Sequence, residues 1–107
     1  MVREITPEEL ARLLKEGHQK LVLLDVREND ERAAARIDPS LHIRMHEVPV
    51  RQREIPAQTK VVVYCHHGHR SLVVGAFLET HGFPDVASLQ GGIDAWAQRI
   101  DRSIPRY

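Results

Sequence analysis

The stretch Val61-Val-Val-Tyr-Cys-His-His-Gly-His-Arg-Ser71, with the apolar segment 72–78 behind it, decides the fold that this sequence predicts. Residues 61–64 are β-prone, and their pattern indicates a short buried strand. Cys65, the only cysteine of the chain, follows this strand directly. A loop with three histidines, a glycine and an arginine comes next. The apolar run behind the loop predicts a helix over 71–81.

A strand, a tight turn and a helix N-terminus gather several backbone N–H groups around one point, with the positive end of the helix dipole behind them. A cysteine at that point would have its thiolate stabilised, and the thiolate is the nucleophilic form. The junction therefore favours Cys65 as a nucleophile over a buried structural cysteine, although free cysteines are often buried. A thioredoxin-like redox role is not favoured, because the chain has no second cysteine.

Towards the N-terminus, Thr6-Pro7-Glu8-Glu9 is a strong helix start. Thr6 is the expected N-cap, Pro7 takes the first helical position, and Glu9 closes a capping box. Gly17 is the expected end of this helix. Its leucines recur at helical spacing and are expected to face the core; they are Leu10, Leu13 and Leu14.

The other elements alternate between strands and helices. Strands are predicted over 21–26, 41–45 and 86–89, with a further short strand ending at Ile5. Helices are predicted over 31–36 with Asn29-Asp30 as the cap, over 47–53, and over 93–100 after a turn at Gly91-Gly92. This order predicts one α/β domain over 1–107, with three layers: a central, mostly parallel sheet of about five strands and helices on both faces.

The composition excludes several classes of function. The chain has 107 residues, 42% of them apolar, and its 15 basic side chains balance 15 acidic ones. No net field therefore favours nucleic acid or an anionic membrane, and no stretch is long enough to span a membrane. The N-terminus lacks an apolar signal core, and a single cysteine fits a reducing compartment. A cytoplasmic protein with neither nucleic-acid nor membrane partners is expected.

Four segments together resemble the rhodanese family of single-domain sulfurtransferases. They are Leu23-Leu-Asp-Val-Arg-Glu28, the strand and loop 62–71, the helix end Gly82-Phe83, and Leu89-Gln-Gly-Gly-Ile-Asp-Ala-Trp96. Each segment alone is only a weak indication of the family. Their order and spacing together are specific for it, and they span nearly the whole chain. One segment departs: where the family usually has Gly-His-Ile-Pro-Gly-Ala, this chain has Ala35-Arg-Ile-Asp-Pro-Ser40, so two expected glycines are absent.

The resemblance implies that Cys65 accepts a sulfane sulfur, forms a persulfide, and passes the sulfur to a thiophilic acceptor, without a cofactor. The donor would be thiosulfate, another small anion, or a persulfidated protein; the acceptor stays open. The backbone N–H groups of the loop would cradle the persulfide or the anionic donor. The resulting substrate-binding set is His66, His67, Gly68, His69, Arg70 and Ser71.

Several of these side chains have more than one interpretation. The imidazoles can favour anions when protonated, or His67 and His69 can simply face water. Arg70 can bind an anion or brace the loop by pairing with a carboxylate. Asp25 and Arg27 lie at the end of another strand, so we expect a structural ion pair at the same rim of the sheet.

A metal site in the loop is not expected. Cys65 and the three histidines lie within five consecutive residues, which would need a contorted loop to surround one ion, whereas zinc sites usually use separated pairs of ligands. Trp96 is expected to pack in the core.

Two other functions remain as alternatives. Certain phosphatases and arsenate reductases look like rhodaneses with five residues between the cysteine and its arginine, whereas only four separate Cys65 from Arg70. The tighter loop favours a sulfur atom over a tetrahedral phosphoryl group. A non-catalytic rhodanese-like binding module is the other alternative, and the presence of the cysteine argues against it.

Overall fold

A five-stranded sheet forms the centre of the protein in the computed structural model, which describes residues 2–17 and 20–107. Its strands are β1 (Arg3–Ile5), β2 (Leu21–Asp25), β3 (Leu41–His42), β4 (Lys60–Tyr64) and β5 (Val86–Leu89). They run in the order β1-β5-β4-β2-β3, and every neighbouring pair is parallel. The predicted α/β fold is confirmed, although the weakest predicted strand, 41–45, is only two residues long.

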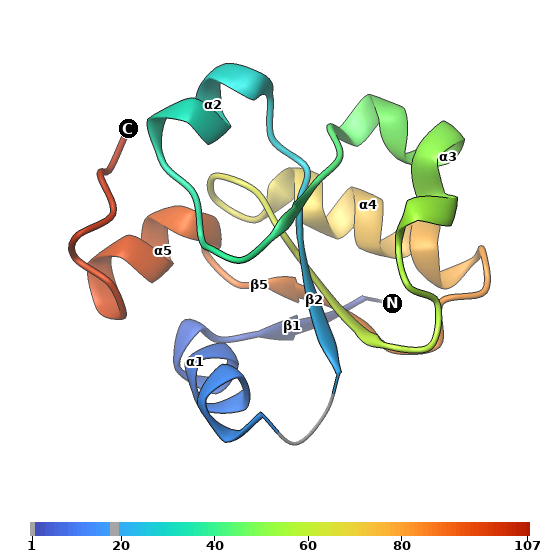
Figure 1. Cartoon of the computed structure of the whole chain (residues 1–107), viewed down its shortest axis with the longest axis horizontal. Helices are drawn as coiled ribbons and strands as arrows, with labels where there is room; N and C mark the ends of the chain where they lie inside the picture. The colour runs from blue at the N-terminus through green and yellow to red at the C-terminus, as the bar shows by residue number, and fades with distance from the viewer. Residues whose placement is uncertain (1, 18–19) are drawn as a thin grey trace.

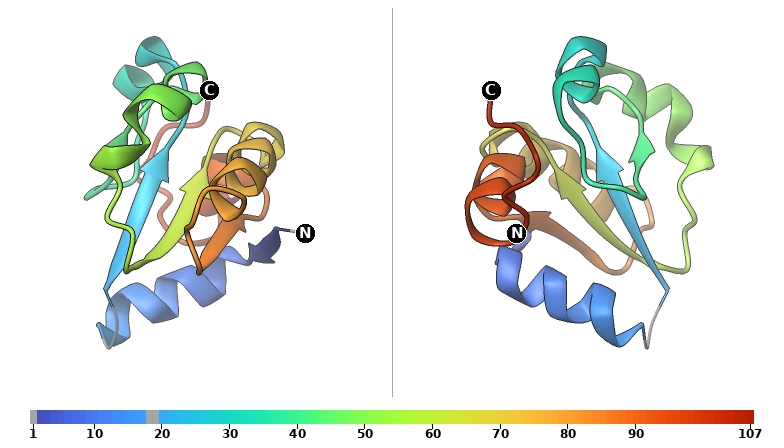
Figure 2. Two further views of the ribbon diagram at one scale, coloured as in Figure 1. Left: turned by 90° about the vertical axis from the view of Figure 1, so that its right-hand side faces the viewer. Right: turned by 60° about the vertical axis from the view of Figure 1, so that its left-hand side comes forward.

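Helices cover both faces of the sheet (Figures 1 and 2). They are α1 (Pro7–Glu16), α2 (Asn29–Ala34), α3 (Val48–Arg51), α4 (His69–Glu79) and α5 (Gly92–Arg99). Short 3₁₀ turns, Met45–Glu47 and Gln52–Glu54, flank α3. Figure 2 (right) shows α1 and α5 on one side of the sheet and α3 on the other. In the described part of the chain, no helix has the length and apolar character needed to cross a membrane.

The strand that leads into the loop, β4, is buried along its whole length. Its side chains alternate between two hydrophobic clusters, because successive residues of a strand point to opposite faces. Val61 and Val63 pack with α4 residues, whereas Val62 and Tyr64 pack with Leu10 of α1 and residues of α5. Cys65 continues the alternation and lies on the α4 side. The core thus fixes the direction of the cysteine side chain.

Helix α1 begins and ends as predicted. The Glu9 N–H donates to the Thr6 hydroxyl at 3.1 Å, the Thr6 N–H donates to the Glu9 carboxylate at 3.1 Å, and Gly17 ends the helix with φ +65°. Leu10 is fully buried, but Leu14 is 41% exposed, so its predicted core position is wrong. The reason is that only the N-terminal part of α1 is buried.

Several predicted helix boundaries are wrong by one or two residues. Glu28, and not Asn29-Asp30, is the N-cap of α2, and its N–H donates to the Glu31 carboxylate at 3.0 Å. Helix α4 begins at His69 and ends at Glu79, two residues before each predicted boundary. Its C-cap is therefore Thr80, not the glycine at 82.

The segment 35–40 does not need the glycines that the rhodanese pattern has there. Among the residues that the structure describes, no residue other than glycine has a positive φ. Ile37 is buried, and its N–H donates to the Tyr64 hydroxyl at 3.2 Å. The segment therefore reaches the core without a positive φ, the backbone conformation for which glycine would be needed.

Candidate active site

The sulfur of Cys65 lies in a cradle built by the loop and the first turn of α4. The backbone N–H of Gly68 lies 3.1 Å from Sγ, and the N–H of Ser71 lies 3.4 Å from it. The Ser71 hydroxyl is a further 3.5 Å contact. The two N–H groups are placed to donate to a thiolate, and the N-terminus of an eleven-residue helix adds its dipole. Cys65 itself is only 1% exposed.

The loop is shorter than the sequence indicated, because His69 and Arg70 already belong to α4. Gly68 is the N-cap and has φ +108°, a left-handed conformation that favours glycine. This conformation turns the Gly68 N–H towards the sulfur. Of the six predicted N–H donors, the described hydrogen bonds to Sγ involve only those of Gly68 and Ser71.

Helix α5 holds the other side of the loop. The Ile93 N–H donates to the Cys65 carbonyl at 2.9 Å, and the Asp94 N–H donates to the His66 carbonyl at 3.1 Å. Gly92 makes this approach possible: a Cβ at that position would lie 2.3 Å from the His66 carbonyl oxygen. The Gly91-Gly92 turn predicted from the sequence therefore also fixes the backbone of the loop that follows Cys65.

Ser71 is itself positioned by a buried partner. Its hydroxyl lies 2.7 Å from the Ser88 hydroxyl on β5, and it donates to the Gly68 carbonyl at 3.2 Å. Both serines are fully buried. Ser88 was not predicted as part of the site, because a serine inside an apolar strand carries no signal of its partner.

The three loop histidines have different surroundings. The His66 ring is partly buried and stacks between His67, at 3.9 Å between ring centroids, and Tyr107, at 4.0 Å. Burial, together with His67, lowers the pKa of His66 and favours its neutral form. His67 and His69 are exposed, as one of the two interpretations expected.

Arg70 pairs with a carboxylate. Its guanidinium donates to both oxygens of Glu31 on α2, at 2.6 and 2.8 Å. These hydrogen bonds lower the pKa of Glu31 to about 2. This pairing corresponds to the second interpretation of Arg70, in which it braces the loop by binding a carboxylate. In this structure both carboxylate oxygens of Glu31 accept from the Arg70 guanidinium. Glu31 was not predicted as the partner of Arg70, because the two residues are 39 positions apart along the chain.

Asp25 and Arg27 form the expected ion pair, and both are fully buried. Arg27 donates to both carboxylate oxygens of Asp25 at 2.8 Å. Burial alone would raise the pKa of Asp25, but the hydrogen bonds and charge of Arg27 outweigh it and lower this pKa. The Tyr64 hydroxyl adds a donor to Asp25 at 3.2 Å, so the carboxylate is well satisfied.

The C-terminal segment, which showed no pattern in the sequence, reaches this rim. The Tyr107 hydroxyl accepts from Arg27 at 2.8 Å and donates to Glu31 at 3.0 Å. Burial raises the pKa of Tyr107 to about 12, so its hydroxyl is protonated and can donate. Arg106 pairs with Asp94 on α5 at 2.9 Å. These long-range contacts carry no local sequence signal.

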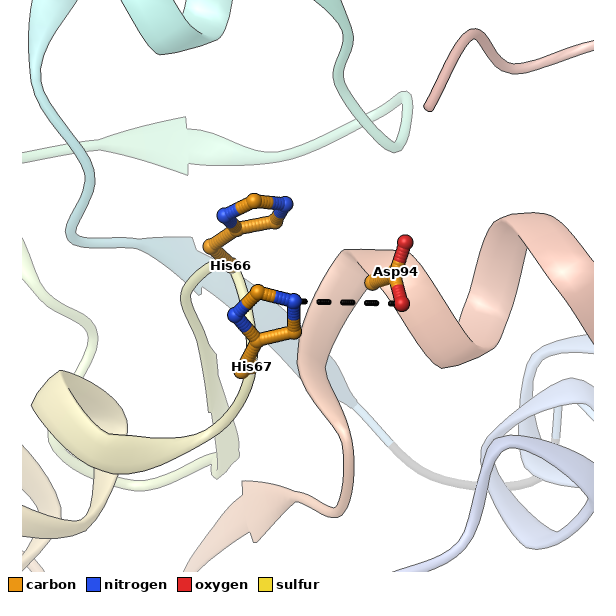
Figure 3. Close-up of side chains that lie close together, drawn as sticks. All are labelled: His66, His67 and Asp94. Carbon is orange, nitrogen blue, oxygen red and sulfur yellow. Dashed lines mark ion pairs between the residues drawn. The ribbon is translucent and has the colours of Figure 1, made fainter. Parts of the chain in front are cut away.

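A cluster of possible ligand atoms lies beside the loop. Figure 3 shows the stacked rings of His66 and His67 with a nitrogen of each on the side of Asp94. The His67 Nε2 lies 3.9 Å from the nearer Asp94 carboxylate oxygen. One ligand atom from each of the three residues lies within 4.8 Å of the others. The structure therefore brings two of the loop histidines to Asp94, and not to Cys65 or His69.

Comparison with known proteins agrees with the sequence pattern. The rhodanese-like domain family matches residues 6–99. A sulfurtransferase of Allochromatium vinosum is 40% identical over 98 residues, which cover 92% of this chain and 91% of that protein. The thiosulfate sulfurtransferase GlpE of Pseudomonas syringae is 37% identical over 94 residues, with 88% of this chain and 86% of that protein covered.

Solved structures show the same architecture. The crystal structure of a rhodanese-like domain protein from Staphylococcus aureus superposes with a TM-score of 0.84 at 27% identity. The match covers 99% of each chain. The arrangement of sheet and helices described above is therefore shared along the entire length.

Proposed function

The chain belongs to the rhodanese-like domain family, whose curated relatives are sulfurtransferases, and on that premise we propose that Cys65 carries a sulfane sulfur as a persulfide between a donor and a thiophilic acceptor. The observation that carries this proposal is the cradle around Sγ. Gly68 and Ser71 offer backbone N–H groups to the sulfur at 3.1 and 3.4 Å. The same donors that stabilise a thiolate would stabilise the anion of a persulfide.

The reaction has two steps. In the first, the Cys65 thiolate attacks the outer sulfur of the donor; a Cys65 S–S bond forms, the donor's bond to that sulfur breaks, and the donor leaves with the electron pair. With thiosulfate the leaving group is sulfite. In the second step a thiophilic anion such as cyanide attacks the outer sulfur, and the Cys65 thiolate is released. Each step is a nucleophilic displacement, so no external oxidant or reductant is needed.

Thiosulfate is the donor that we propose to test first, because the relatives named GlpE are thiosulfate sulfurtransferases. A persulfidated protein is the other donor class. The short loop supports sulfur over phosphate as the transferred group: the cradle begins only three residues after Cys65, at Gly68. Arg70, the cation that a phosphoryl group would need, already binds both carboxylate oxygens of Glu31.

The test is the intact mass of the protein after incubation with thiosulfate and removal of the small molecules. We expect the parent chain to gain the mass of one sulfur atom and to lose it when cyanide is added. Cys65→Ser should show no gain while retaining the thermal unfolding profile of the parent. The replacement is nearly isosteric, so loss of sulfur uptake will not reflect loss of the fold.

A gain of sulfur that persists in Cys65→Ser would contradict the covalent scheme. If the parent chain gains no sulfur from thiosulfate, the same measurement with a persulfidated protein decides whether the donor or the chemistry is wrong. No gain from either donor, with hydrolysis of a phosphate ester, would favour phosphate chemistry. No reaction at all would favour a binding module.

A further inference from the structure

We propose that His66, His67 and Asp94 form a binding site for a divalent transition-metal ion of the zinc type, at the edge of the catalytic loop. Two imidazole nitrogens and one carboxylate oxygen are a donor set that Zn²⁺ accepts, with a fourth position left for water. The inference does not rest on sulfur transfer, because none of the three residues carries the sulfur. Binding can therefore succeed or fail independently of the proposed reaction.

The first observation is the position of the ligand atoms. The His66 and His67 rings are stacked with an interplanar angle of 28°, and Figure 3 shows that each ring has a nitrogen on the side of Asp94. All three ligand atoms lie within 4.8 Å of one another. Ligands at 2.0–2.2 Å around a tetrahedral ion are about 3.3 Å apart. A small rotation of the exposed His67 side chain closes the remaining gap.

The second observation is an unpartnered nitrogen. Nε2 of His66 is buried and has no hydrogen-bond partner among the described residues. A buried polar atom without a partner costs free energy, and most such atoms in folded proteins are satisfied. A metal ion at this point would satisfy the lone pair of the neutral ring.

The third observation is that the backbone fixes the ligands relative to one another. The Asp94 N–H donates to the His66 carbonyl at 3.1 Å, so the two ligand-bearing residues are joined directly. The adjacent bond from Ile93 to the Cys65 carbonyl, at 2.9 Å, holds the same two segments. The backbone segments that carry the ligands are therefore held together before an ion binds, and the exposed His67 side chain is the part that an ion must order.

The Asp94 carboxylate is also oriented by its neighbours. Arg106 donates through Nε to Oδ1 at 2.9 Å and through Nη2 to Oδ2 at 3.4 Å, and Oδ2 is the oxygen that lies 3.9 Å from His67 Nε2. Gln98 donates to Oδ2 at 2.9 Å. A carboxylate oxygen can accept a hydrogen bond and still bind an ion, and ligating carboxylates are usually hydrogen-bonded in this way.

This cluster differs from the set of loop residues, Cys65 and the three histidines, for which the sequence predicted no metal site. That set was confined to five consecutive residues and included Cys65 and His69. Asp94 comes instead from α5, 27 positions beyond His67 in the sequence. Asp94 therefore supplies one ligand from a segment separate from the loop, as zinc sites in proteins usually have. The contact between α5 and the loop is a tertiary feature that the sequence pattern did not show.

The experiment is a calorimetric titration of the full chain with Zn²⁺ alone, after treatment with a chelator, together with thermal unfolding with and without the ion. We expect one ion per chain and a higher unfolding temperature with Zn²⁺, because the ion binds the folded form. His67→Gln and Asp94→Asn should each weaken the affinity at least tenfold, since each removes one ligand. His67 is exposed, so its replacement should leave the fold intact.

Two control variants make the result specific. His46→Gln removes an exposed histidine outside the cluster and should leave the affinity unchanged. Cys65→Ser should also leave it unchanged. Parent-like affinity in both His67→Gln and Asp94→Asn would overturn the proposal. Loss of binding in Cys65→Ser would overturn it as well, because the thiolate and not the carboxylate would then be the third ligand.

Discussion

At the scale of single residues, Ser71 contributes two groups to the surroundings of the Cys65 sulfur. Its N–H is fixed by the backbone of α4, whereas its hydroxyl lies 3.5 Å from Sγ and depends on the side chain. The hydroxyl is also bound to Ser88 at 2.7 Å. The contribution of the hydroxyl can therefore be separated from that of the backbone by mutation.

Ser71→Ala should lower kcat/KM for thiosulfate about tenfold. Loss of one strong oxyanion donor costs about 100-fold or more. The Ser71 hydroxyl lies 3.5 Å from Sγ and donates to the Gly68 carbonyl in this structure, so a smaller effect is expected. Steady-state kinetics with thiosulfate and cyanide measure it. Ser88→Ala is the matched control, because it removes the partner of Ser71 but no group that contacts Sγ. An equal loss in both variants would contradict a direct role of the Ser71 hydroxyl.

The Glu31–Arg70 pair gives the protein a pH-dependent contribution to stability. Arg70 lowers the pKa of Glu31 from 4.5 to about 2. A carboxylate with a depressed pKa in the folded state stabilises the fold above its unfolded pKa. This contribution is lost as the pH falls from about 5 towards 2. Urea unfolding of the parent chain should therefore show a fall in stability over this range.

Glu31→Gln is the comparison for this prediction. The variant keeps the shape of the side chain but has no charge to lose, so its stability should fall less between pH 5 and pH 3. The two chains should differ most near neutral pH and converge in acid. Parallel pH profiles for the two chains would show that the pair does not contribute.

The positions of some residues of the candidate site could be predicted from the sequence, and those of others could not. Cys65 was predictable because its chemistry and its place after a strand are both local. Glu31 and Tyr107 were not, because their contacts with Arg70 and Arg27 span 39 and 80 residues. Asp94 belonged to a segment that supported the family resemblance, yet its position beside His66 depends on the packing of α5 against the loop.

At the scale of elements, the junction between α5 and the catalytic loop depends on one glycine. Gly92 has φ +62°, and a Cβ there would lie 2.3 Å from the His66 carbonyl oxygen and 2.5 Å from that of Cys65. Real Cβ atoms do not approach so closely. A side chain at this position must therefore push the loop away from α5.

Gly92→Ala should destabilise the protein by about 3 kcal/mol or more and abolish most sulfur uptake. Gly17→Ala is the matched control: it has a similar φ of +65°, but no atom lies within 4 Å of its Cβ position. It should cost only about 1 kcal/mol and leave sulfur uptake intact. Chemical unfolding and the mass assay measure both variants. Equal costs would show that the backbone angle alone matters.

The elements themselves were well predicted where the signal was local. The capping box of α1 and the buried run of β4 both appear where the sequence placed them. Helix α4 starts two residues early because Gly68 takes the N-cap position with a positive φ, although it has no capping side chain. The C-terminal half of α1 is exposed because burial depends on neighbours, not on spacing.

At the scale of the whole molecule, Arg27 links three parts of the chain. It binds Asp25 at the end of β2, the Ala35 carbonyl beyond α2 at 2.6 Å, and the Tyr107 hydroxyl. The guanidinium is fully buried. These partners accept hydrogen bonds from several N–H groups of the planar guanidinium, a set of directions that no other side chain offers.

Arg27→Met should cost about 3 kcal/mol in the free energy of unfolding, because Asp25 would lose its fully buried cation and keep only the ion pair with the partly exposed Arg32 at 3.1 Å. Arg36→Met is the matched control. Arg36 pairs with Asp38 at 3.1 Å, but both side chains are more than half exposed, so the loss should stay below about 1 kcal/mol. Chemical unfolding at neutral pH compares the two. Similar losses would mean that the buried pair contributes no more than an exposed one.

The order of the strands has a consequence for self-association. The two strands at the edges of the sheet, β1 and β3, are three and two residues long, whereas the inner strands β2 and β4 have five residues each. An edge strand offers unpaired N–H and C=O groups on which another chain can add a strand. Such short edges give a second molecule little backbone on which to extend the sheet, and so protect the fold against aggregation through its strands.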